Sequence, residues 1–367
     1  MKLGLVVPGG VDRSGTHRVI PCLLWLLERI SRHHDVHVFA MYGTGRDPLY
    51  DLCGATVHVI SRTGRRIPST LREVLHEHRR GRIDVLQAFW VSGPGVVAGL
   101  AGLLIRRPVL LHIPGGDLVA IPDIGYGGRR TAVKRLRVKF ALTTAARRTA
   151  PSRQVCDAAA RLGHPAEQVP LGVSREAWVP TRPRPRDPDE PAHLVHVGSL
   201  NRVKDQSTLL RAVHRMSAAG LAFTLDIVGT DTLGGEMQRL ATELGVGDRT
   251  RFHGFLPQEA VRPLVSAAHL MLVSSRHEAG PVAAAEAAML GVPTVGTAVG
   301  ILPEWAPEAA AVVPVGDDAA LATAALELLQ DEDRRLRMGA AAQARALSRD
   351  ADWSARRMLA LYEEVTR

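Results

Sequence analysis

The chain has 367 residues, of which 46% are hydrophobic and 23% are charged, and this balance excludes a disordered, collagen-like or disulfide-stapled protein. At about 100–200 residues per domain, the length favours two domains. Lysine and arginine (46) outnumber aspartate and glutamate (37), so the formal net charge of +9 favours an anionic partner: nucleic acid, a phosphorylated substrate or an acidic membrane surface.

Short apolar segments alternate with helical patterns along the first half of the chain. Strands are expected at residues 3–7, 36–41, 56–60, 85–91 and 109–112, and helices at 19–30, 70–78 and 96–105. The uncharged stretch 85–105 is long enough to span a bilayer, but the polar and glycine-rich residues within it favour a strand followed by a buried helix. Continuous apolar strands separated by helices predict a parallel sheet with both faces covered.

A proline-rich, charged segment at 181–191 interrupts the alternation, which then restarts. Strands are expected at 193–197, 224–228, 251–253, 270–273 and 293–296, and helices at 206–218, 236–244, 281–290 and 319–329. We therefore expect two doubly wound α/β halves. In such sheets the ligand site lies beyond the carboxyl ends of the strands, where the strand order reverses. The cleft between two facing halves is the expected site.

Three cysteines, Cys22, Cys53 and Cys156, lie far apart and form no CxxC pair, which favours reduced thiols in a cytoplasmic protein. The first apolar run, residues 3–7, is too short for a signal peptide.

The most informative segment is 274–300, in which Glu278 and Glu286 flank a Gly-Pro turn and an alanine-rich helix. Pro281 suits the first turn of that helix, where its missing N–H costs nothing. Free amides at a helix N-terminus suit a diphosphate or sugar oxygens. A carboxylate at Glu286 can accept hydrogen bonds from vicinal hydroxyls such as those of a ribose.

This segment resembles the E-x7-E signature of retaining, family-4-type glycosyltransferases of the GT-B fold, the group 1 glycosyl transferases. The family has E-G-F-G-x-x-x-x-E, whereas this chain has E-A-G-P-V-A-A-A-E with the same glutamate spacing and the following G-x-P. The resemblance implies that Glu278 and the amides of the turn hold the donor sugar and that Glu286 holds the ribose. The turn comprises Ala279, Gly280, Pro281 and Val282.

A second match begins at Gly198, where the family commonly has V-G-R-L and then a lysine. Lys204 falls on the family lysine, which binds the diphosphate and stabilises the leaving group, while Ser199 replaces the usual arginine. Arg202 is the candidate for the second cation. A third match is D-I-V-G ending at Gly229, followed by R-F-H-G-F, in which Phe255 is either a base contact or an apolar core residue.

The first half matches less sharply. Residues 8–15 resemble the family's glycine-rich first loop and contain Gly9, Gly10 and Gly15. Relatives carry H-G-x-D where this chain has Pro114 and Asp117, so Asp117 is carried over as a site residue. The family histidine is absent at Pro114, and His112 is either its substitute or a satisfied core residue.

The resemblance implies an acceptor domain at 1–172, a linker at 173–191, a donor domain at 192–347 and a last helix at 348–367 that returns to the first domain. Trp353 and Tyr362 would anchor that helix. The expected function is retaining transfer of a sugar from a UDP- or GDP-linked donor to a polysaccharide, lipid-linked or small-molecule hydroxyl. The alternatives are a non-catalytic sugar-nucleotide-binding protein and a GT-B sugar-nucleotide epimerase.

Two further features bear on partners. Residues 129–148 contain eight basic residues and no acid, which suits either a helix lying on anionic lipid at the inner membrane face or a solvated basic surface. The basic residues are Arg129, Arg130, Lys134, Arg135, Arg137, Lys139, Arg147 and Arg148. No nucleic-acid-binding motif is present. Asp187 and Asp189 form an incidental D-x-D, no HExxH or EF-hand loop occurs, and neither a metal nor an obligatory cofactor is expected.

Overall fold

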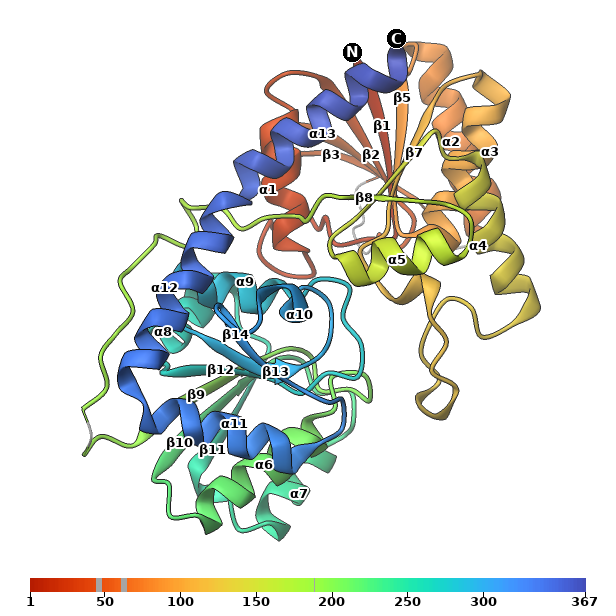
Figure 1. Ribbon diagram of the computed structural model, residues 1–367. Helices are drawn as coiled ribbons and strands as arrows, with labels where there is room; N and C mark the ends of the chain where they lie inside the picture. The colour runs from red at the N-terminus through yellow and green to blue at the C-terminus, as the bar shows by residue number, and fades with distance from the viewer. Residues whose placement is uncertain (44–47, 61–64, 188) are drawn as a thin grey trace. The chain divides into compact units, whose positions relative to one another are not determined.

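Strands and helices alternate in the computed structural model as the hydrophobic pattern predicts. It describes residues 1–43, 48–60, 65–187 and 189–367. Two compact units are present: unit 1 comprises residues 1–172 and 351–367, and unit 2 comprises residues 173–350 (Figure 1). Pro188, the middle residue of the D-x-D pattern, lies outside the described residues.

Unit 1 is built on an eight-stranded sheet in the order β3-β4-β2-β1-β5-β6-β7-β8. Its strands are β1 Lys2–Val7, β2 Asp35–Ala40, β3 Leu49–Leu52, β4 Ala55–Val59, β5 Val85–Phe89, β6 Val109–His112, β7 Arg147–Ala150 and β8 Glu167–Gln168. All neighbouring pairs are parallel except β3 with β4. The strand order reverses at β1 and β5, so the loops that follow these two strands lie at the switch point.

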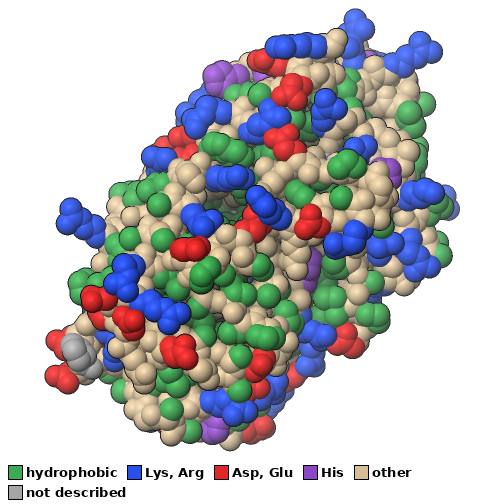
Figure 2. All heavy atoms as spheres, viewed as in Figure 1, with side chains coloured by type: hydrophobic (Ala, Val, Ile, Leu, Met, Phe, Trp, Pro, Cys, Tyr) green, Lys and Arg blue, Asp and Glu red, His purple; other side chains and the backbone are tan. Residues whose placement is uncertain are grey.

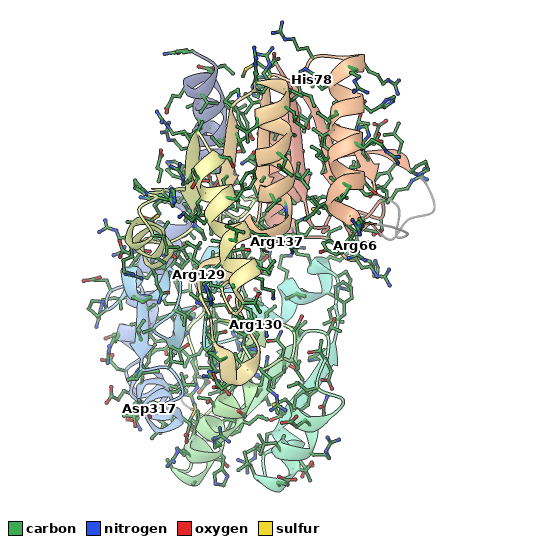
Figure 3. All side chains as sticks on the ribbon, turned by 90° about the vertical axis from the view of Figure 1, so that its right-hand side faces the viewer. Arg66, His78, Arg129, Arg130, Arg137 and Asp317 are labelled. Carbon is green, nitrogen blue, oxygen red and sulfur yellow. The ribbon has the colours of Figure 1, made fainter. Side chains whose placement is uncertain are left out.

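Helices cover both faces of this sheet. Helices α2 (Arg66–Arg80), α3 (Val96–Ile105) and α4 (Ala132–Thr144) lie side by side, as Figures 1 and 3 show. Helix α1 (Pro21–Ile30) packs with α13 (Ala351–Thr366). Helix α5 (Arg153–Arg161) follows β7.

The last helix completes the core of unit 1. Buried side chains of α13, including Met358, Leu361 and Tyr362, join the apolar cluster made by β1, β2, β5 and α1. The Tyr362 hydroxyl donates to Oε1 of Gln87 on β5. This contact satisfies two polar groups that burial would otherwise leave unpaired. Trp353 packs at the edge of the same cluster.

Unit 2 has a six-stranded parallel sheet in the order β11-β10-β9-β12-β13-β14. Its strands are β9 Ala192–Val197, β10 Phe223–Val228, β11 Thr250–Gly254, β12 Leu270–Val273, β13 Thr294–Thr297 and β14 Ala310–Val313. Its helices are α6 Gln206–Ala218, α7 Glu236–Glu243, α8 Gln258–Ala267, α9 Val282–Met289, α10 Leu302–Trp305, α11 Asp318–Gln330 and α12 Glu332–Ser348. Both units are therefore doubly wound α/β domains, as predicted.

The proline-rich segment differs from its expected role as a linker. Residues 173–191 belong to unit 2, where the Trp178 side chain is fully buried. The backbone carbonyl of Arg184 accepts from the buried guanidinium of Arg335 on α12 at 2.5 Å. Proline has no amide donor, so a proline-rich segment cannot form the regular backbone hydrogen bonds of a strand. Here side-chain contacts hold the segment against unit 2.

The apolar stretch 85–105 forms β5, a π-helical turn at Val91–Gly95 and α3. Among the described residues, no helix combines the length and the apolar character that crossing a membrane requires.

Candidate functional site

The candidate site lies at the switch point of the unit 2 sheet. Strand β9 stands between β10 on one side and β12 on the other, so the strand order reverses there. The loop after β9 carries Lys204, and the loop after β12 carries Glu278. The carboxyl ends of neighbouring parallel strands thereby bring together two residues that are 74 positions apart.

An ion pair joins the two loops. Lys204 Nζ donates to Glu278 Oε1 at 2.5 Å, and the hydroxyl of Ser275 donates to the same oxygen at 2.7 Å. The two charged side chains are 25% and 14% exposed, so the pair is partly desolvated and still reachable from solvent. An ammonium group has three donors, and the carboxylate has a second oxygen. The pair can therefore take a diphosphate oxygen on one side and a sugar hydroxyl on the other.

A frame of backbone contacts fixes the position of Lys204. The Asn201 side-chain carbonyl accepts from the Val203 and Lys204 amides at 3.2 and 3.0 Å. The Ser274 hydroxyl donates to the Lys204 carbonyl at 2.9 Å, which links the two loops again. Asp205 then caps α6 by accepting from the Thr208 amide at 3.4 Å. Lys204 is thus held at the end of an ordered turn.

Two buried side chains support this loop from below. The His196 imidazole Nδ1 lies 2.9 Å from the Leu272 carbonyl on β12, and its Nε2 lies 3.1 Å from Gln206 Nε2. Gln206 in turn donates to the Ser199 carbonyl at 3.1 Å. Burial lowers the pKa of His196 to about 4, so the ring is neutral at physiological pH. The motifs did not indicate this pair, because its partners come from separate elements.

Two glycines allow the strand ends to approach. Gly229 has φ +151°, and a Cβ there would stand 2.1 Å from the Gly198 carbonyl oxygen. Only a residue without a side chain fits such an approach. At Gly198 a Cβ would stand 3.3 Å from Lys204 Cε, so the glycine leaves room for the Lys204 side chain.

Helix α9 carries the second glutamate of the motif. It begins at Val282, one residue later than expected, and Pro281 is its N-cap. Glu286 Oε1 accepts from the Gln258 side chain of α8 at 3.0 Å. Burial raises the pKa of Glu286 to about 8, although the hydrogen bond from Gln258 opposes that shift. The Ala284 amide donates to the Pro281 carbonyl at 3.1 Å, whereas the amides of Val282 and Ala283, the first two of the helix, have no intrahelical acceptor.

Other donor-site candidates lie apart from the ion pair. Arg202 makes two contacts of 2.9 Å with Glu236 of α7, so its guanidinium is engaged there rather than beside Lys204. Ser199 is exposed and supplies no charge. Phe255 follows β11 and is 49% exposed, which differs from the buried core position that was one of its two interpretations.

In unit 1, His112 is a core residue. Its Nδ1 lies 2.9 Å from the Thr149 hydroxyl, its ring packs edge-on against Phe89, and it is fully buried. Burial lowers its pKa to about 3. The buried ring therefore has the position of a core residue, and its Nε2 has no hydrogen-bond partner among the described residues.

Asp117 lies in a 3-10 turn after β6 and accepts from the Ser92 amide and hydroxyl at 3.3 and 3.2 Å. Burial raises its pKa, and its Oδ2 has no hydrogen-bond partner among the described residues. A buried carboxylate oxygen without a partner is unusual, which makes Asp117 a candidate contact for a ligand hydroxyl.

The glycine-rich loop follows β1, at the same edge of the sheet. Gly10 has φ +81°, and a Cβ there would overlap the Ile20 side chain at 2.4 Å. Gly15 closes a turn by donating its amide to the Asp12 carbonyl at 3.0 Å. Gly9 has more room, because a Cβ there would lie 3.6 Å from the nearest atom, the carbonyl oxygen of Tyr42.

Comparison with known proteins shows which family the second half of the chain resembles. The model of the family "Glycosyl transferases group 1" matches residues 180–345. A D-inositol 3-phosphate glycosyltransferase of Thermomonospora curvata is 34% identical over 194 residues, covering 49% of this chain and 42% of that relative. A 2-deoxystreptamine N-acetyl-D-glucosaminyltransferase of Streptomyces fradiae is 30% identical over 288 residues, covering 74% and 66%. Each match leaves a third or more of the relative's length uncovered.

A solved structure, that of Anabaena HepE in complex with UDP-glucose, resembles this chain with a TM-score of 0.78 at 18% identity. The match covers 99% of this chain and 100% of that one, and it shows the shared fold. Together with the family match, the two doubly wound units establish the predicted fold class. Residues 180–345 of the chain thus match the group 1 glycosyl transferases, and the chain has the GT-B fold.

Proposed function

We propose that the chain transfers a sugar from a nucleotide diphosphate sugar to a hydroxyl acceptor, with retention of the anomeric configuration. The ion pair of Lys204 and Glu278 at the strand ends of unit 2 carries this proposal. As the glycosidic bond to the diphosphate breaks, negative charge develops on the phosphate oxygens. A preorganised ammonium group and the first-turn amides of α9 stabilise that charge without needing to reorganise.

The two glutamates have different tasks in this mechanism. Glu278 accepts hydrogen bonds from hydroxyls of the donor sugar, because its carboxylate is already oriented by Lys204 and Ser275. Glu286 binds the ribose hydroxyls, and Phe255 is placed to contact the base. The Lys204 ammonium group, which pairs with Glu278 in the free enzyme, also donates hydrogen bonds to the leaving diphosphate and stabilises its negative charge. We assign no protein nucleophile.

The donor proposed is UDP-linked or GDP-linked. The Anabaena structure of the same fold is described as a complex with UDP-glucose, which makes UDP the first probe. Neither a metal nor an obligatory cofactor is assigned to the donor site, since Lys204 and the helix amides supply the positive charge that the diphosphate needs.

Transfer by two variants tests this assignment. Removing the charge in Lys204→Ala or the carboxylate in Glu278→Ala should lower the rate of transfer or donor hydrolysis by about 100- to 1000-fold, as loss of one transition-state contact does. Arg215→Ala is the matched control: this arginine of α6 is 54% exposed, pairs with Asp318 and belongs to neither proposed site, so its loss should change the rate little. If both site variants keep the wild-type rate, the assignment is wrong. The anomeric configuration of the product, read by NMR, tests retention.

The acceptor is proposed to bind unit 1, near Asp117 and the glycine-rich loop. Sugar hydroxyls of a polysaccharide, a lipid-linked sugar or a small molecule fit the unpaired Asp117 oxygen. An acceptor panel with Asp117→Asn identifies the class, because the amide removes the charge and keeps the shape. Unchanged acceptor KM would place the acceptor elsewhere.

We further propose a cytoplasmic protein with peripheral contact at the inner membrane face through α4. Val133 and Leu136 of this helix are 60% and 69% exposed, and basic residues flank them. Figure 3 shows Arg129, Arg130 and Arg137 along this side, and basic side chains gather in the same region in Figure 2. Cosedimentation with anionic vesicles should fall at high salt and in Leu136→Glu. Equal sedimentation with neutral vesicles would contradict the proposal.

A further inference from the structure

A group of polar side chains lies between α2 and the sheet of unit 1. His37 on β2 and His58 on β4 are on the same face, because His58 pairs with Phe39 and side chains alternate along a strand. Helix α2 runs from Arg66 past His78 (Figure 3). Glu77 belongs to its last turn and contacts Lys2 of β1 and His37 of β2. His58 and Glu77 are each only 6% exposed.

The three side chains bring their ligand atoms to one point. One such atom from each of His37, His58 and Glu77 lies within 4.8 Å of the others. His37 Nδ1 is 2.9 Å from His58 Nε2 and 3.7 Å from Glu77 Oε1. Two ligands at bond lengths of about 2.0–2.1 Å from a tetrahedral zinc ion stand about 3.3 Å apart. The two observed distances, 2.9 and 3.7 Å, lie on either side of that value, so small shifts of the three side chains would let them bind one ion.

The opposite nitrogen of each histidine faces a carboxylate. His37 Nε2 lies 3.2 Å from Asp35 Oδ1, and His58 Nδ1 lies 3.3 Å from Glu73 Oε1. The 2.9 Å contact between the two rings is a hydrogen bond when one of the facing nitrogens carries the proton. When both N–H groups point to the carboxylates instead, both facing nitrogens present lone pairs that a cation can bind. Carboxylates behind the ligating histidines are the usual outer partners of protein-bound zinc.

The third ligand is also held from behind. Lys2 Nζ of β1 donates to Glu77 Oε1 at 2.5 Å, which leaves further lone pairs of that carboxylate available. The cluster contains three carboxylates and one ammonium group, counting the outer pair Asp35 and Glu73. A divalent cation would balance this excess of two negative charges.

We propose that His37, His58 and Glu77 form a zinc site that ties α2 to the sheet of unit 1. Two imidazole nitrogens and one carboxylate oxygen are ligands suited to Zn²⁺, and water completes the fourth position. None of the three ligands belongs to the donor or acceptor site proposed above, so we assign the zinc a structural role, and its test is independent of transferase activity.

Zinc binding by the full chain tests the proposal. A tag-free preparation treated with chelator and then dialysed is titrated with Zn²⁺ alone in a calorimeter. We expect one saturable equivalent per chain. His37→Gln and His58→Gln should abolish it, and Glu73→Gln, which removes only an outer partner, should weaken the affinity by about 10- to 100-fold. Co²⁺ in place of Zn²⁺ should give the visible absorption bands of a tetrahedral site.

His33→Gln is the matched control, because His33 is an exposed histidine just before β2, the strand that carries His37. This variant should still bind one equivalent of zinc. Far-UV circular dichroism checks that each variant is folded, and Glu73, which is 38% exposed, can change with little risk to the fold. Failure of the wild-type chain to take up one equivalent would overturn the proposal. So would uptake that persists unchanged in folded His58→Gln, because surface histidines would then be responsible.

Discussion

The ionisation of Glu286 makes a quantitative prediction about nucleotide binding. Burial holds its pKa at about 8, so about nine in ten of these carboxyl groups carry a proton at pH 7, since one pH unit corresponds to a factor of ten. If ribose hydroxyls donate to the ionised carboxylate, UDP binding must expel that proton. We expect release of about 0.9 proton at pH 7, about 0.5 at pH 8 and about 0.1 at pH 9.

Calorimetry in buffers of different ionisation enthalpy measures this release. Glu286→Gln cannot ionise and keeps the size of the side chain, so the difference between wild type and variant removes the contribution of UDP itself. The wild-type affinity should fall about tenfold from its plateau above pH 8 to its value near pH 7, and the variant should show no such fall. If the wild type and Glu286→Gln release the same number of protons across pH 7–9, UDP binding does not expel the Glu286 proton. The carboxyl group then stays protonated in the complex.

The same group contributes to stability with a definite sign. The folded-state pKa of Glu286 is raised above its ordinary value of 4.5, so between about pH 4.5 and 8 the folded chain holds a proton that the unfolded chain has lost. Its contribution to the free energy of unfolding therefore falls as the pH rises through this window. Urea unfolding at several pH values should show the wild type losing stability relative to Glu286→Gln, and a parallel dependence would contradict this.

Three further changes test the packing around both units. Gly229→Ala places a Cβ 2.1 Å from a backbone carbonyl, and it should lower the free energy of unfolding, measured in urea, by at least about 1–3 kcal/mol. Tyr362→Phe leaves the buried amide of Gln87 without its donor, and the same measurement should show a loss of about 1–3 kcal/mol. Ser275→Ala removes one hydrogen bond to the Glu278 carboxylate, so kcat/KM for transfer should fall about tenfold while the fold is kept.

Each of these predictions has a control. Gly220→Ala introduces a Cβ at a positive φ with no neighbour within 4 Å, so it isolates backbone strain from overlap. If Gly229→Ala lowers the free energy of unfolding no more than Gly220→Ala does, the close approach of the two strand ends adds nothing to the loss of stability. Wild-type stability in Tyr362→Phe would mean that water replaces the hydroxyl. Wild-type kcat/KM in Ser275→Ala would mean that Lys204 alone orients Glu278.

Local patterns predicted most of the sheet and the donor-site motif. Strands with a continuous apolar run, such as β1 and β12, and helices with clear caps, such as α6, have boundaries that the hydrophobic pattern indicates. Strands β3 and β7 were not predicted, because they are four residues long and partly polar. Short elements near a sheet edge carry little hydrophobic signal and depend on a neighbour for their hydrogen bonds.

The spacing of Glu278 and Glu286 can be read from the chain alone, because both lie in one strand–turn–helix segment whose geometry is local. The contacts of the side chains depend on the three-dimensional fold. It pairs Lys204 with Glu278, turns Arg202 toward Glu236, and buries His112 between strands. These contacts join residues from separate elements, and only the order and register of the strands bring such residues together. The cluster of His37, His58 and Glu77 arises in the same way, since no local spacing links a β2, a β4 and an α2 residue.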